Sequence, residues 1–141
     1  MARMTRDEAI AFLTTGTRTG KLATISADGA PHVAPIWFVH DSGTLVFNTW
    51  HESAKARNLR RDPRASLVVD LEEPPYAFVI VRGTVTLSDD LDEVKRFATD
   101  IGRRYMGEDR AEEFGARNGV EGELLVRLSM DKVIAHGDVS T

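Results

Sequence analysis

The residues best suited to chemistry lie between Phe47 and Leu59, in the stretch FNTWHESAKARNL, where a strand pattern gives way to a short helix pattern. Free backbone N–H groups at the start of a helix attract phosphate and other anions. Polar side chains surround that point, namely Asn48, Thr49 and Ser53, and Lys55 adds a positive charge. The pattern therefore indicates an anion-binding site, although a solvated helix with a serine cap fits the same spacing.

The helix in this stretch has two distinct faces. Lys55 and Asn58 are three positions apart and share one face, whereas Ala56 and Leu59 share another that is suited to packing. Four arginines make the surroundings basic in a protein whose net charge is −4: Arg57, Arg60, Arg61 and Arg64. These arginines either receive an anionic part of a ligand or are solvated, and the spacing fits both interpretations.

The signatures of most other catalytic sites are missing. The histidines, His32, His40, His51 and His136, show neither the helical pairing nor the carboxylate cluster of a zinc site, so we expect no metal. No serine lies in a Gly-x-Ser-x-Gly motif, and no glycine-rich nucleotide motif is present. We therefore expect chemistry that a bound cofactor performs, and we assign no catalytic side chain.

The elements that must position this segment are mainly strands. Strand patterns cover Lys21–Ser26, His32–His40 and Thr44–Thr49. Short turns join the three, which predicts antiparallel neighbours. The second is apolar on both faces, which predicts burial on both. Ahead of them, Thr5 and Glu8 form a capping box for a helix that ends near Gly16 and Gly20.

Strands and helices also follow the Ser53–Arg61 helix. Further strand patterns cover Ala65–Leu71, Tyr76–Leu87 and Gly122–His136. Gly83 marks a bulge or bend in the longest of these. Ser88 is expected to cap a long helix that ends at Gly107, and a short helix covers about Asp109–Arg117. This order predicts a mainly β fold with flanking helices, in which six antiparallel strands form a closed or nearly closed barrel.

Composition limits the class of protein. The chain has 141 residues, of which 42% are apolar, which suits one domain spanning 1–141. The net charge of −4 argues against a nucleic-acid binder. No apolar run is long enough to span a membrane, and the charged N-terminus does not fit a signal peptide. Together with the absence of cysteine, this favours a cytoplasmic protein.

Two long stretches resemble a known family. These are Lys21–Phe38, KLATISADGAPHVAPIWF, and Phe47–Val69, which contains Lys55, Asn58-Leu59 and Asp62-Pro63-Arg64-Ala65. Both resemble the pyridoxamine 5'-phosphate oxidase-like split β-barrels, also called FMN-binding split barrels. The similarity extends through Tyr76–Leu87 to Arg103–Gly107, and it is greatest to the flavin/deazaflavin oxidoreductases that use coenzyme F420.

The resemblance implies a homodimer with two cofactor sites at the subunit interface. It implies that the cofactor phosphate lies at Asn48, Thr49, Ser53 and Lys55, with Arg57 and Asn58 on the same helix. The ring system would lie against Val33, Ala34, Pro35, Ile36 and Trp37, although the pattern around Trp37 by itself suggests a core residue. The partner subunit would close the site with Tyr76, Ala77 and the Tyr105-Met106 region.

The chain departs from pyridoxamine-phosphate oxidases proper at two places. An arginine precedes the phosphate lysine in those enzymes, whereas Ala54 stands there in this chain. The C-terminal segment with tryptophan, arginine and histidine is also missing from Arg127–Gly137. We therefore do not expect oxidation of pyridoxamine phosphate.

The resemblance as a whole implies a deazaflavin-dependent reductase. Reduced coenzyme F420 would pass a hydride to a conjugated small-molecule substrate bound over its ring. An FMN-dependent oxidoreductase of the same fold is the second possibility. A non-catalytic cofactor carrier or haem-binding module is the third, because the scattered histidines neither establish nor exclude an axial ligand.

Overall fold

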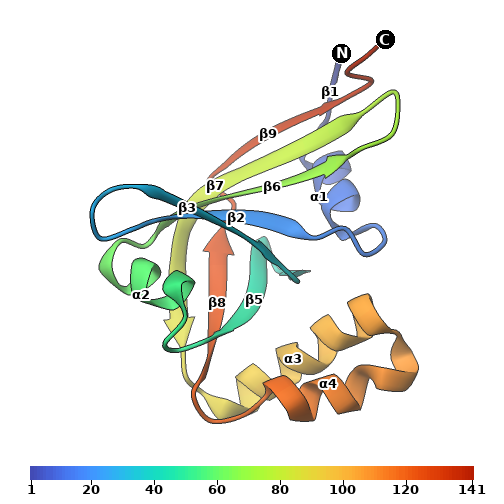
Figure 1. The fold of residues 1–141 in the computed structure, drawn as a ribbon. Helices are drawn as coiled ribbons and strands as arrows, with labels where there is room; N and C mark the ends of the chain where they lie inside the picture. Colours follow the sequence, from blue (N-terminus) through green and yellow to red (C-terminus); the bar gives the residue numbers. More distant parts are fainter.

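The computed structural model describes residues 1–141, and its strands form one strongly curled sheet with helices at its ends (Figure 1). The strands are β1 (Ala2–Arg3), β2 (Gly20–Ile25), β3 (Pro31–Ile36), β4 (Val39–Asp41), β5 (Thr44–Trp50), β6 (Arg64–Leu71), β7 (Ala77–Ser88), β8 (Glu123–Ser129) and β9 (Lys132–Gly137). The helices are α1 (Arg6–Thr14), α2 (Ala54–Arg61), α3 (Leu91–Met106), the 3₁₀ turn η1 (Glu108–Arg110) and α4 (Ala111–Asn118). None of the helices is both long and apolar enough to cross a membrane.

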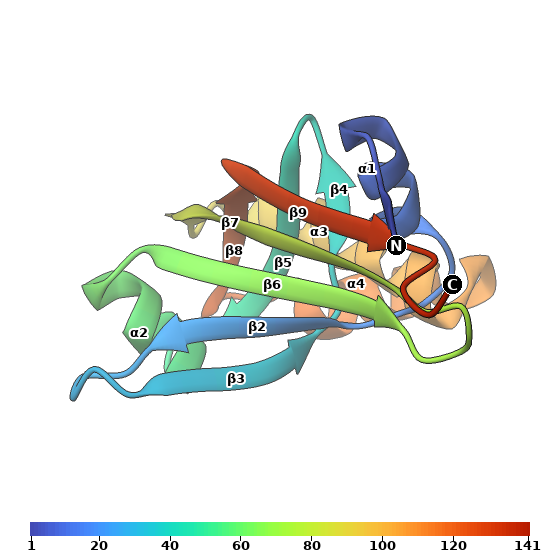
Figure 2. The same cartoon turned by 90° about the horizontal axis from the view of Figure 1, so that it is seen from above.

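All strand pairs are antiparallel, as the sequence predicted. The main path of the sheet runs β3-β2-β6-β7-β8-β5-β4, and β9 pairs with β7 on one side and β1 on the other. Figure 2 shows β3, β2, β6, β7 and β9 lying side by side, while β5 and β8 form the other half of the curl. The fold is therefore mainly β, and its sheet forms a half-barrel that is consistent with a split barrel.

The long strand β7 joins the two halves of the curl. Its first part, Phe78–Arg82, pairs with β9, and its last part, Val85–Ser88, pairs with β8. Gly83 lies between these parts, and a Cβ added to it would stand 1.8 Å from the carbonyl oxygen of Ser129. The predicted bend at Gly83 is confirmed, because only a residue without a side chain permits this close crossing.

The prediction of six strands is wrong: the structure has nine, because two predicted strands are each divided and the short strand β1 was not predicted. The His32–His40 pattern becomes β3 and β4, which are the two edges of the main path. The backbone of Phe38 leaves the sheet because its N–H donates to Tyr105 Oη at 3.3 Å and its carbonyl accepts from Arg104 Nη1 at 2.6 Å. The Gly122–His136 pattern similarly becomes β8 and β9, which pair with different parts of β7.

The prediction that both faces of the second strand are buried is also wrong. Residues of β3 alternate between exposed and half-buried up to Ile36, because β3 pairs only with β2 and forms an edge. Two prolines lie in this strand, at positions 31 and 35, and an edge strand tolerates residues without a backbone donor. The expected pairing of three consecutive strands thus holds for β2 with β3 and for β4 with β5, but not between β3 and β5.

Two groups of apolar side chains hold the molecule together. The inside of the curl is filled by Leu22, Leu67, Val79, Val81 and Phe47, with Ala9 and Leu13 of α1 closing one end. A smaller group attaches α3 to the outside of β5 and β8, and it consists of Val46, Val94, Phe97 and Leu125. Helix α3 therefore lies over the strand that leads into the candidate site.

Most predicted helix boundaries agree with the structure. The capping box of Thr5 and Glu8 is present at the start of α1. Ser88, in contrast, ends β7, and Asp90 caps α3 by accepting from the N–H groups of Asp92 and Glu93. The predicted 109–117 helix is observed as η1 followed by α4.

Candidate functional site

The site is built around the connection from β5 to α2. Ser53 caps α2 by accepting a hydrogen bond from the N–H of Ala56 at 3.1 Å. The Ser53 hydroxyl also lies 2.8 Å from that of Thr49, the penultimate residue of β5, which ties the helix start to the strand. Ala54 and Lys55, the first two helical residues, have no earlier carbonyl within the helix to bond, so their N–H groups remain available as donors.

Helix α2 carries a positive charge where a helix normally prefers a negative one. Its first turn contains no acidic residue, whereas α1, α3 and α4 each have two there. Lys55 occupies that turn and forms no ion pair. Since the N-terminal end of a helix is itself positive, a bound anion would stabilise both the lysine and the helix.

Lys55 faces a pocket of about 290 Å³. Its apolar wall comes from the end of β3 and from α3, and its polar wall comes from β5, α2, α4 and β8. The lining residues are Pro35, Ile36, Trp37, Asn48, Lys55, Ile101, Asn118 and Glu123. Five of them are predicted cofactor residues, so the structure places the expected ring-binding strand and the expected phosphate lysine around one cavity.

Neighbouring groups hold the apolar wall in place. The ring of Trp37 stacks on Tyr105 of α3, with the ring centroids 5.0 Å apart and the planes 4° from parallel. The Tyr105 hydroxyl donates to the carbonyl of Arg18 at 3.0 Å, and burial raises the pKa of this phenol. Trp37 is thus a fixed, half-buried surface of the pocket as well as a packed residue.

The same contacts also determine the role of Tyr105. Its ring and hydroxyl are engaged within its own subunit, against Trp37 and against backbone groups of Arg18 and Phe38. These contacts give Tyr105 a packing role within one chain. That the Tyr105-Met106 region closes the partner's site stays a prediction.

The polar wall contains a carboxyl group opposite the lysine. Glu123 is the first residue of β8 and pairs in register with Trp50 of β5. Burial raises the pKa of Glu123, while the charges of His51 and Lys55 act in the opposite direction. Asn48 closes this end by donating to the carbonyl of Asn118 at 3.2 Å.

Two further predicted residues of α2 lie outside the pocket lining. Asn58 is only 6% exposed and donates to the hydroxyl of Thr24 at 3.1 Å, so its amide attaches α2 to β2. Arg57 is exposed. The packing face of Ala56 and Leu59 is confirmed, since both are buried.

Most of the arginine cluster is occupied by contacts within the chain. Arg60 donates to the carbonyl of His51 at 2.7 Å, and Arg61 donates to that of Ile25 at 3.3 Å. Arg64 forms a two-point ion pair with Asp62, which holds the Asp62 pKa at about 2. Only Arg57 of the four is without such a contact.

The remaining predicted residues lie further from Lys55. Val33, which is 63% exposed, and Ala34 lie on the edge strand β3. Ala77 begins β7 and Tyr76 directly precedes it, at the end of the sheet opposite α2 in Figure 1. Within one subunit they do not approach the pocket, and their predicted role depends on a second copy of the chain.

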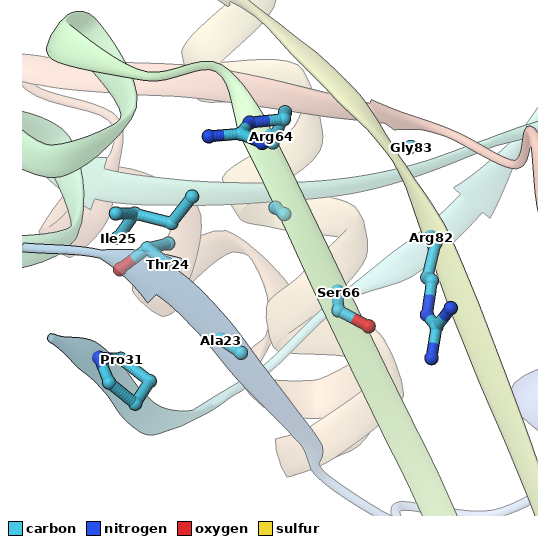
Figure 3. A pocket seen from close by; sticks show the side chains of 9 residues that line it. Ala23, Thr24, Ile25, Pro31, Arg64, Ser66, Arg82 and Gly83 are labelled. Carbon is cyan, nitrogen blue, oxygen red and sulfur yellow. The ribbon is translucent and has the colours of Figure 1, made fainter. Parts of the chain in front are cut away.

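A larger pocket, of about 350 Å³, lies on the outer face of the sheet (Figure 3). Residues from β2, β3, β6 and β7 line it, with Arg64 and Arg82 on either side of Ser66. None of the predicted cofactor residues is among them, so we place the candidate site at Lys55 despite the greater size of this outer pocket. No group of three or more His, Asp or Glu side chains is arranged to hold a metal ion.

Sequence reasoning missed three pocket residues: Ile101, Asn118 and Glu123. The helical spacing around Ile101 indicated only a packing face. Glu123 reaches the site because β8 pairs with β5, and no local pattern reveals that pairing. The sole signal was a charged residue at the start of a predicted strand.

The donor set around Lys55 fits a phosphorylated, flat cofactor. One ammonium group, free helix N–H groups and two hydroxyls gather at one end, and indole and aliphatic surfaces gather at the other. Such an arrangement binds an anion through charge-assisted hydrogen bonds and an apolar ring by contact.

Comparison with known proteins agrees with this geometry. The family model described as "Pyridoxamine 5'-phosphate oxidase" matches residues 6–136. A conserved hypothetical protein from Mycobacterium tuberculosis is 25% identical, with a TM-score of 0.84 over 97% of this chain and 87% of that one. An F420 reductase is also 25% identical, with a TM-score of 0.68 over 86% and 93% of the two chains. The heme storage protein from Vibrio cholerae shares the fold at 18% identity, with a TM-score of 0.73 over 98% and 100%.

Proposed function

The chain belongs to the pyridoxamine 5'-phosphate oxidase family, and we propose that it is an oxidoreductase that binds a phosphorylated flavin-type cofactor at Lys55. Coenzyme F420 is our first choice of cofactor. The reaction would be hydride transfer from the reduced cofactor to a conjugated small molecule.

The observation that carries this proposal is the position of Lys55. It stands in the first turn of α2 without an ion-pair partner and shares a pocket with Pro35 and Ile36 of the edge strand and with Trp37, which directly follows it. A phosphate bound at Lys55 would neutralise the unpaired charge of the ammonium group. A ring attached to that phosphate would reach the apolar wall of the pocket. The family and the similarity to an F420 reductase support the same interpretation.

The residues of the pocket would bind and orient rather than react. Lys55 and the N–H groups of α2 would hold the phosphate, while the stack of Trp37 on Tyr105 would provide a rigid surface that excludes water. When bound, the cofactor supplies the hydride chemistry. No side chain is assigned as catalytic.

An FMN-dependent oxidoreductase is the second candidate, and one observation favours it. Coenzyme F420 carries an anionic glutamate tail, and binding this tail was one of the two roles that the sequence left open for the arginines from Arg57 to Arg64. Three of these four have partners within the chain. FMN has no such tail and needs only the phosphate site. A non-catalytic cofactor or haem-binding module is a third possibility.

We also propose that the protein is a homodimer whose second subunit completes the site with Tyr76 and Ala77. Val68, Ile80 and Ile134 occupy one row across β6, β7 and β9. Their neighbours Leu67, Val69, Val79 and Val81 are buried inside the curl, so this row points outward, where it is only partly buried. Such an apolar row suits contact with another copy of the chain.

Titrating the purified apoprotein with coenzyme F420 and with FMN in parallel tests the proposal. We expect both to bind, F420 more tightly, and the reduced holoprotein to be reoxidised by conjugated acceptors. Tight FMN binding without F420 binding would leave only the second candidate. Cofactor binding without any acceptor-dependent reoxidation would favour a carrier.

A further inference from the structure

Glu123 is a half-buried residue whose place in the pocket has no structural explanation. One of its carboxyl oxygens, Oε2, is buried and has no hydrogen-bond partner. The side chain lines the same cavity as Lys55, yet neither residue belongs to an ion pair. A buried carboxyl oxygen without a partner is costly, and packing alone does not require one here.

Charged groups lie on two sides of Glu123. Lys55 faces it from α2, and His51 faces it from the turn between β5 and α2, where it also contacts Glu52 at 3.4 Å. Glu123 also lines a neighbouring hollow, together with His51, Arg60, Asp89 and Glu121.

The remaining residues of the Lys55 pocket carry no titratable group: Pro35, Ile36, Trp37, Asn48, Ile101 and Asn118. Within this pocket the charge therefore depends on Lys55 and Glu123.

Burial determines the direction in which the pKa of Glu123 shifts. Desolvation raises this pKa and outweighs the opposite effect of Lys55 and His51. An additional anion bound at Lys55 would raise it further, since like charges disfavour ionisation. An anionic ligand and an ionised Glu123 therefore oppose each other in this cavity.

We propose that Glu123 is a specificity-determining residue that sets how much negative charge the Lys55 pocket accepts, with its carboxyl taking up a proton when a doubly charged phosphate binds. This inference rests on the proposed cofactor site. Ionised Glu123 offsets the charge of Lys55 and leaves the pocket suited to a singly charged phosphodiester. Neutral Glu123 leaves Lys55 unopposed and admits a phosphomonoester.

The two candidate cofactors differ in this property. The phosphate of FMN is a monoester, whose charge near neutral pH is about −1.5 to −2. The phosphate of coenzyme F420 is a diester, with a single charge. Glu123 thus provides a physical reason for a preference between them that does not involve the arginines.

The test compares FMN and riboflavin binding to the wild-type protein and to Glu123→Gln, from about pH 5 to about pH 8. Glutamine has nearly the same shape and no charge. At the upper end the variant should bind FMN at least about fivefold more tightly, because it lacks the carboxylate charge. The gain should shrink as the pH falls, since protonation removes that charge from the wild-type protein as well. Riboflavin, which lacks phosphate, should bind both proteins equally.

Glu121→Gln is the matched control, because Glu121 is exposed on the loop that leads into β8. It should leave FMN affinity unchanged. Calorimetry of FMN binding to the wild-type protein in two buffers of different ionisation enthalpy gives a measurement that needs no variant. We expect net proton uptake, beyond that of the phosphate itself, which the Glu123→Gln protein lacks.

The outcomes separate this inference from the proposed function. If Lys55→Ala weakens FMN binding and Glu123→Gln leaves it unchanged at every pH, the role of Glu123 is wrong and the cofactor site stands. If Lys55→Ala has no effect, the cofactor site itself is misplaced. If neither FMN nor coenzyme F420 binds, both proposals are overturned.

Discussion

Lys55 is the residue on which the proposed cofactor site depends, because of its surroundings. An unpaired ammonium group near the positive end of a helix is unfavourable unless an anion joins it. The sequence identified this residue because its signals are local: a serine cap, polar side chains and a lysine within a few positions. Glu123 carries no such signal, since only the register of β5 with β8 brings it to the cavity.

Asp62 shows a second effect at the scale of single residues. Its carboxylate accepts from Arg64 Nε at 3.0 Å and from Arg64 Nη2 at 2.6 Å, where α2 turns into β6. This pairing lowers the pKa of Asp62 from 3.8 to about 2. A carboxyl group whose pKa is lowered by folding stabilises the native state above its unfolded pKa, and the contribution is lost as the pH falls towards the folded value.

We therefore predict that Asp62→Asn makes stability less sensitive to acid. Between about pH 4 and pH 2, the thermal midpoint of the wild-type protein should fall more steeply than that of the variant. Because Asp62 and Arg64 lie at the surface, the difference should shrink at high salt. Parallel slopes for the two proteins would show that the ion pair does not contribute.

At the scale of elements, the sequence predicted the positions of strands better than their ends. The break between β3 and β4 arises because Tyr105 and Arg104, far along the chain, bind the backbone of Phe38. The break between β8 and β9 arises where the N–H of Asp131 donates to the carbonyl of Arg82 at 3.0 Å. Both breaks depend on distant partners, which a local apolar pattern cannot reveal.

The bend of β7 was predictable from Gly83 itself, and it yields a test. We predict that Gly83→Ala lowers the free energy of unfolding by at least about 2 kcal/mol, because the added methyl group would overlap the Ser129 carbonyl. Thr84→Ala, at the exposed neighbouring position, should have a much smaller effect. Chemical denaturation measures both, and equal stability of the two variants would contradict the assigned role of Gly83.

For the whole molecule, family membership and the half-barrel architecture account for the arrangement of one subunit. They do not by themselves bring Tyr76 and Ala77 to the pocket, because these residues lie at the start of β7, away from α2. In the proposed dimer, a second copy covers the outer face of the sheet and brings them there. The sequence indicated this only through the family, because apolar side chains on an outer face look the same as those of a core.

The proposed dimer predicts that Ile80→Lys yields a monomer. A lysine in the middle of the outward apolar row would place an uncompensated charge in the interface, while a monomer could leave it in water. Sedimentation at micromolar concentration should show a dimer for the wild-type protein and a monomer for the variant, with weaker cofactor binding. Thr86→Lys, at an exposed position on β7, serves as the control. A monomeric wild-type protein would contradict the shared site.

A thermodynamic cycle between Lys55 and the cofactor phosphate shows whether the phosphate lies at Lys55. It compares the dissociation constants of FMN and riboflavin for the wild-type protein and Lys55→Ala, with Lys95→Ala, an exposed lysine of α3, as the control. We predict that Lys55→Ala weakens FMN binding by about 1.5–3 kcal/mol and leaves riboflavin binding almost unchanged. Equal losses for both ligands, or no loss for either, would show that the phosphate does not lie at Lys55.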